Sequence, residues 1–129
     1  MDSHCTKKLK KPFEEVITKV TESLQKQGFG IITSIDVKDT LKKKLGINFR
    51  NYKILGACNP EFAYKVISIE SHSGLMLPCN ILVQEHENGE VELTAENPME
   101  KLTDTLNLDI TGIAEEISQR LRTAVNEVN

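Results

Sequence analysis

The chain has 129 residues, of which 39% are hydrophobic and 27% are charged. These fractions exclude intrinsic disorder and favour one soluble domain over residues 1–129, with its core in about 12–128. Aromatic residues make up only 5% and tryptophan is absent, so aliphatic side chains must build the core. No apolar stretch approaches the roughly 20 residues of a membrane-spanning helix, which excludes a membrane partner.

The charges are divided unevenly between the two halves of the chain. Residues 1–65 carry 13 Lys and Arg against 7 Asp and Glu, a balance of +6, whereas residues 66–129 carry 3 against 12, a balance of −9. Such asymmetry marks either a tail that binds nucleic acid or membrane, or two faces that meet within the fold or across an oligomer. Neither half has an unbroken run of charge, so we favour meeting faces.

The expected compartment is the cytoplasm. The first eleven residues are polar and basic with no apolar segment after them, which predicts no signal peptide. Three cysteines, Cys5, Cys58 and Cys79, are too few for a disulfide framework and indicate a reducing environment.

The first half alternates between strands and helices. Residues 3–9 predict a strand, and Pro12 then opens a helix that Gly28 ends. β-Branched residues over 29–35 predict a second strand. Asp36 caps a short helix with one apolar stripe, which ends at Gly46. The stripe consists of Val37, Leu41 and Leu45.

The middle of the chain repeats this alternation. Residues 52–57 predict a strand, and Asn59-Pro60 supplies the cap and first residue of another helix. Residues 75–83 form the most apolar predicted strand. Its inward side would consist of Leu75, Leu77, Cys79, Ile81 and Val83.

The last part predicts a hairpin and two helices. Asn88-Gly89 between two extended runs is a strong hairpin signal, and the returning strand over 91–96 has one polar face. A short helix follows over 99–106. A long helix with one apolar face then covers 111–128.

These elements predict an α+β fold: strand, helix, four strands, helix, as a curved antiparallel sheet with two long helices packed on one face. A doubly wound parallel sheet is the alternative. It requires strands buried on both faces, which the polar face of 91–96 contradicts.

Two cysteine motifs are the candidate functional site. Cys58-Asn59-Pro60 joins a strand to a helix, and Pro78-Cys79-Asn80 lies early in the next strand. Antiparallel pairing of these strands would bring Cys58 and Cys79 close, and the helix N-terminus favours a thiolate. A reactive thiol, a redox pair or a soft-metal site with His72 as third ligand are the chemical hypotheses.

A structural role is the competing hypothesis, and we favour it. Free cysteines commonly act as small buried hydrophobes, and the spacing of Cys58 and Cys79 lacks the short pairs of a structural zinc site. Nucleic-acid binding through the lysines of 7–11 and 42–44 is a weaker hypothesis, because no aromatic residues are interleaved for base stacking. Neither a glycine-rich phosphate loop nor a nucleophile elbow is present.

The chain resembles the family catalogued as domain of unknown function 302. The resemblance runs from about Phe13 to Val128 and depends on the order of Cys58-Asn59-Pro60 and Leu77-Pro78-Cys79. It implies small bacterial and archaeal proteins, a fold similar to the repeat of the TATA-binding protein, and dimers, with no established activity. Ser34 departs from the charged residue expected in the strand after the first helix.

We therefore expect an uncharacterised, noncatalytic ligand-binding or protein-interaction module that acts as a homodimer, with a groove between sheet and helices. The alternative is a thiol, redox or metal-dependent function at Cys58 and Cys79. The candidate site residues are Cys58, Asn59, Pro60, Pro78 and Cys79, with His72 as a further metal candidate.

Overall fold

The computed structural model describes residues 4–102 and 107–129. The strands are β1 (His4–Leu9), β2 (Gly30–Asp36), β3 (Tyr52–Cys58), β4 (Cys79–Glu85) and β5 (Val91–Glu96). The helices are α1 (Phe13–Lys26), α2 (Val37–Leu45), α3 (Pro60–Ile69), the 3-10 helix η1 (Ser71–Met76), α4 (Pro98–Leu102) and α5 (Leu108–Asn126).

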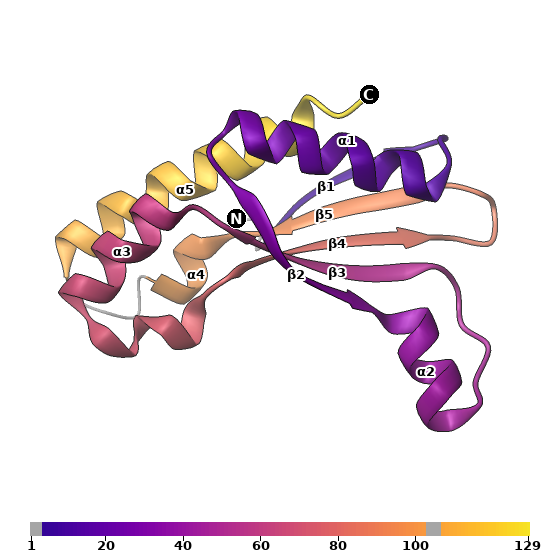
Figure 1. Cartoon of the computed structure of the whole chain (residues 1–129). Helices are drawn as coiled ribbons and strands as arrows, with labels where there is room; N and C mark the ends of the chain where they lie inside the picture. The colour runs from indigo at the N-terminus through magenta and orange to yellow at the C-terminus, as the bar shows by residue number, and fades with distance from the viewer. Residues whose placement is uncertain (1–3, 103–106) are drawn as a thin grey trace.

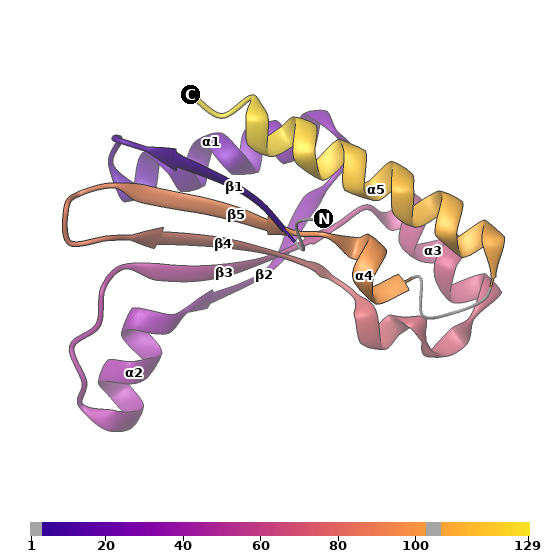
Figure 2. The same cartoon turned by 180° about the vertical axis from the view of Figure 1, so that it is seen from behind.

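The five strands form one antiparallel sheet in the order β1-β5-β4-β3-β2. The long helices α1 and α5 both cover the same side of this sheet (Figures 1 and 2). The predicted α+β fold is therefore confirmed, and the parallel alternative is wrong. The expected hairpin after β4 is present, with Gly89 in a left-handed conformation at φ 83°.

Local signals set the ends of the helices as expected. The Asp36 side chain accepts a hydrogen bond from the backbone N–H of Asp39 at the start of α2, and Gly46 ends that helix at φ 66°. The last helix begins at Leu108, three residues earlier than predicted. It does so because the Asn107 side chain accepts from the backbone N–H groups of Asp109 and Ile110.

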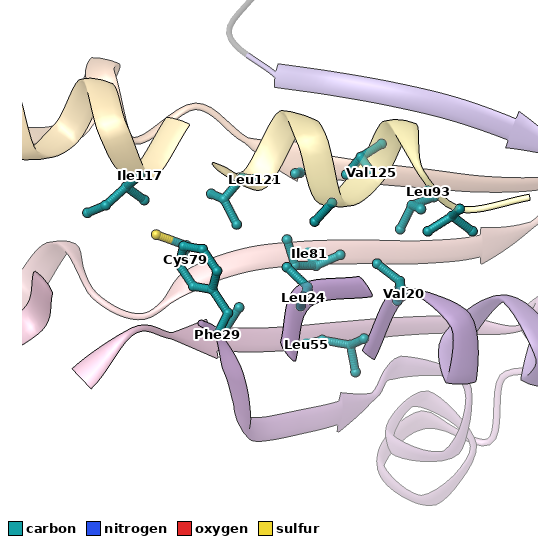
Figure 3. Packing of buried hydrophobic residues seen from close by; sticks show 14 of the residues in the cluster. Val20, Leu24, Phe29, Leu55, Cys79, Ile81, Leu93, Ile117, Leu121 and Val125 are labelled. Atoms are coloured by element: carbon teal, nitrogen blue, oxygen red, sulfur yellow. The ribbon is translucent and has the colours of Figure 1, made fainter. Parts of the chain in front are cut away.

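The core lies between the sheet and the two long helices. Alternate residues of β4 and β5 point into it, as do α1 and α5 (Figure 3). Leu24, Ile81, Leu93, Ile110 and Leu121 are the largest of its completely buried side chains. The core is mainly aliphatic, as the shortage of aromatic residues requires.

The strand predicted over 75–83 is partly wrong. Residues 71–76 form η1 instead, and Leu75 is 84% exposed. The Glu70 side chain caps η1 by accepting from the N–H of His72, and the N–H of Leu77 donates to the carbonyl of Gly74. These local hydrogen bonds turn the backbone before Pro78, so pairing with β3 starts only at Cys79.

The predicted helix over 99–106 is observed in part, as α4. Residues 103–106 of this prediction and Ser3 of the predicted first strand lie outside the described part of the chain. Of the described helices, none combines the length and the apolarity needed to cross a bilayer.

The substitutions Ile81→Ala and Leu75→Ala test whether the strand begins at Cys79, as observed, or at Leu75, as predicted. Ile81 is completely buried, so we expect its truncation to lower the free energy of unfolding by about 2–5 kcal/mol. Leu75→Ala should change it by about 0.5 kcal/mol or less. Urea denaturation of both variants provides the measurement, and equal losses would contradict the exposed position of Leu75.

Candidate functional site

The Cys58-Asn59-Pro60 motif turns the chain from β3 into α3. Asn59 is buried, and its side-chain Oδ1 accepts a hydrogen bond from the backbone N–H of Phe62 at 3.2 Å. Pro60 occupies the first turn of the helix, where a missing N–H costs nothing. Asn59 and Pro60 therefore have a clear structural task, which is to start α3.

Pro78 packs against Gly56 in the neighbouring strand. The Leu77–Pro78 peptide bond is cis. A Cβ at Gly56 would come within 2.8 Å of Cγ of Pro78 and would also collide with Thr33 of β2. Only glycine fits between these two side chains, so Pro78 also contributes to packing.

The sheet register brings the two cysteines together in the backbone but separates their thiols. Ala57 lies opposite Cys79 in the β3–β4 pair, so Cys58 is one residue beyond that position. Side chains alternate along a strand, which directs Cys79 into the core and Cys58 to the other face. Cys79 is 3% exposed and lies near Phe29 and Ile117 (Figure 3), whereas Cys58 is half-buried. None of the three cysteines forms a disulfide.

The proposed third metal ligand lies apart from both cysteines. His72 is in η1 with an 88% exposed side chain, and it contacts the carboxylate of Glu70. The backbone N–H of His72, and then its side chain, donate hydrogen bonds that lower the pKa of Glu70. In residues 4–102 and 107–129, no three His, Cys, Asp or Glu side chains are grouped to hold a metal ion.

Little space is left beside the two motifs. The cavity that Cys58, Pro78 and Cys79 help to line measures about 10 Å³, which is room for at most one water molecule. Ligand pockets usually enclose about 300–1,000 Å³. This cavity beside the two motifs is therefore far too small for a ligand of ordinary size.

The opposite side of the sheet is uncovered by the long helices, and we call it the open face. None of its side chains is buried, in contrast to those that face α1 and α5. Its centre is apolar, with Ile35, Ile54 and Leu82 on three adjacent strands. The open face comprises Thr6, Lys8, Thr33, Ile35, Tyr52, Ile54, Cys58, Asn80, Leu82, Gln84, Glu92, Thr94 and Glu96.

Helix α2 projects from the β2 edge of the sheet on the open-face side (Figures 1 and 2). No residue of α2 is buried, and Leu45 at its end is 65% exposed. A hydrogen bond to Asp39 raises the pKa of Lys43, but this exposed ion pair adds little stability. A nine-residue helix is marginal in water, so α2 needs a surface on which to pack its apolar stripe.

A shallow hollow of about 610 Å³ lies where the loop after α2 meets the β4–β5 hairpin. Arg50 lines this hollow and contacts both rings beside it. Its guanidinium carbon lies 4.5 Å from the ring centre of Phe49 and 5.6 Å from that of Tyr52, and two of its nitrogens donate to Gln84. Arg50 thereby fixes this loop against the sheet at the end where α2 begins.

Sequence reasoning did not identify the open face or the role of α2. The signal was present in adjacent apolar pairs, Ile54-Leu55 and Ile81-Leu82, within strands of a sheet that helices cover on one side only. In such a sheet, one member of each pair must face away from the core.

A family model described as "Domain of unknown function DUF302" matches residues 5–128. The chain belongs to the DUF302 family. The predicted resemblance is thus confirmed over nearly the whole sequence.

A solved structure and a search of curated proteins complete the comparison. The crystal structure of an uncharacterized conserved DUF302 protein from Bacillus stearothermophilus matches with a TM-score of 0.90 at 28% identity, covering all of both chains. No curated protein matches. The family membership therefore establishes the fold of this DUF302 protein, and its function must be argued from surfaces and contacts.

The separation of the thiols can be tested by alkylation of the native protein in a Cys5→Ser background. We expect Cys58 to be modified readily, whereas Cys79 should react only after unfolding because it is 3% exposed. Peptide mass spectrometry after timed labelling with iodoacetamide measures both rates. Modification of both thiols at similar rates in the folded protein would contradict the assignment of Cys79 to the core.

Proposed function

We propose that this DUF302 protein is a noncatalytic protein-interaction module that works as a homodimer through its open face and α2. The observation that carries the proposal is the combination of an apolar sheet centre with a helix whose apolar stripe is at most half-buried in the monomer. Several large apolar side chains of β2, of α2 and of the loop after α2 are also exposed. They are Ile32, Ile35, Leu45 and Ile47.

Clustered apolar residues on one surface support an interaction role. Isolated exposed hydrophobic residues are common on soluble proteins, but a contiguous patch with a polar rim usually marks a binding surface. The centre at Ile54 and Leu82 has such a rim, formed by Gln84, Glu92 and Thr94. The open face therefore has the apolar centre and polar border of a protein interface.

A second copy is the simplest partner, because most soluble oligomers are two-fold dimers with self-complementary surfaces.

Leu82→Asp tests the proposal at the centre of the open face. We expect the wild-type protein to sediment as a dimer and Leu82→Asp to sediment as a monomer, because a carboxylate would be buried without a partner. Sedimentation equilibrium over a range of concentrations measures the difference.

The matched control is Leu75→Asp, which places the same charge on an 84% exposed side chain of η1, outside the open face. This control should remain a dimer. A monomeric wild-type protein at all concentrations, or an unchanged dimer for Leu82→Asp, would contradict the proposal.

A further inference from the structure

We infer that the two copies dock reciprocally, with the basic last turn of α2 in one protomer lying against the acidic β4–β5 hairpin of its partner. This inference rests on the proposed homodimer and specifies its geometry. It assigns an interaction role to Lys42 and Lys44 of α2 and to Glu87 and Glu90 of the hairpin.

Lys8 lies opposite Glu92 in the β1–β5 pair, but no ion pair between described residues joins the first half of the chain to the second. Every ion pair observed between described residues joins two members of the same half, either within 1–65 or within 66–129. Examples are Lys53 with Glu14 in the first half and Arg120 with Glu116 in the second. The lysines of α2 and the carboxylates of the β4–β5 hairpin are therefore not paired with each other within one protomer.

Charged groups of α2 and of the hairpin lack an ionic partner among the described residues. Within the described residues, Lys42 and Lys44 make no ion pair, and Lys42 donates only to the side-chain oxygen of Asn48. In the same part of the structure, the carboxylates of Glu87 and Glu90 also make no ion pair. The basic turn is exposed, and in the acidic hairpin Glu87 is exposed and Glu90 is half-buried. Opposite charges on these two elements are complementary in a two-fold assembly.

The positions of α2 and of the hairpin fit a two-fold arrangement. Helix α2 starts at the β2 edge, at the same end of the sheet as the β4–β5 hairpin, and projects on the open-face side (Figure 1). A two-fold axis can run parallel to the strands, in front of the open face. Rotation about this axis places the β2 edge of one copy beside the β1 edge of the other, and it leaves the β4–β5 hairpins of both copies at the same end of the dimer. It places the partner's α2 over β5 and the hairpin, while the apolar centres of the two sheets face each other.

The two kinds of contact then have different tasks. Apolar residues such as Leu41 and Leu82 supply the association free energy by leaving water. The charges at the ends set the direction in which α2 lies, because the reversed direction would leave the lysines without acidic neighbours. Like-charged replacements should consequently weaken the dimer, and compensating replacements should restore it.

The test is charge reversal on α2 in one variant and on the β4–β5 hairpin in another. Variant A is Lys42→Glu with Lys44→Glu, which retains Lys43 and its ion pair to Asp39. Variant B is Glu87→Lys with Glu90→Lys. We expect each variant alone to dimerise at least about tenfold more weakly than the wild type, because a two-fold interface repeats every repulsion.

An equimolar mixture of A and B should form a heterodimer about as tight as the wild-type homodimer, because both interfaces then join opposite charges. Native mass spectrometry distinguishes the two homodimers from the heterodimer by mass. Restored association also shows that α2 is folded in variant A, where acidic side chains oppose the helix dipole. The neutral variant Lys42→Gln with Lys44→Gln should give an intermediate loss.

The control variant is Lys26→Glu with Arg122→Glu. These exposed residues belong to α1 and α5, on the other side of the sheet, and their replacement changes the net charge by the same amount as variant A. The control should dimerise like the wild type and should not pair selectively with variant B.

Three outcomes separate this inference from the proposed function. A wild-type dimer with an unweakened variant A overturns the docking of α2 but leaves the homodimer intact. Weakened A and B that fail to combine also overturn it. A wild-type monomer contradicts the proposed function itself, and the inference fails with it.

Discussion

The architecture depends on the one-sided covering of a five-stranded antiparallel sheet. Helices α1 and α5 cover the side of the sheet on which Ile81, Val83, Val91 and Leu93 are completely buried, and the same side receives Leu55 and Ala57 of β3. Successive side chains along a strand point to opposite faces of the sheet, so the residue next to one that faces the helices points to the other side. The apolar residues among those neighbours form the open face.

The same constraint explains the two cysteine motifs. Antiparallel pairing brings β3 and β4 together, yet the alternation of side chains along the strands directs Cys58 and Cys79 to opposite faces of the sheet. Asn59, Pro60 and Pro78 serve the helix start and the close packing at Gly56. These contacts account for the motif residues without a ligand. A thiol-dependent function stays a hypothesis for Cys58 on the open face.

Much of the fold was predictable because the decisive signals are local. Asp36, Gly46 and Asn59 cap helices through contacts within a few residues, and the Asn88-Gly89 turn fixes a hairpin. The strand prediction was wrong at its start, from Leu75. The apolar alternation there is typical of a strand, but the hydrogen bonds of η1 determine the backbone conformation instead. The candidate site was harder to predict. The order of strands brings Cys58 and Cys79 together, but the face of each side chain depends on a register that the sequence does not specify by itself.

The central claim is that α2 and the open face are covered by a second copy of the chain. Hydrogen exchange of the α2 amides, measured by mass spectrometry at increasing protein concentration, tests it directly. A nine-residue helix without buried side chains should exchange rapidly in the monomer and become protected as the dimer forms. The account predicts slower exchange at 37–45 as concentration rises, while the core strands β4 and β5 exchange slowly throughout. Rapid exchange of α2 in a sample that sedimentation shows to be dimeric would contradict it.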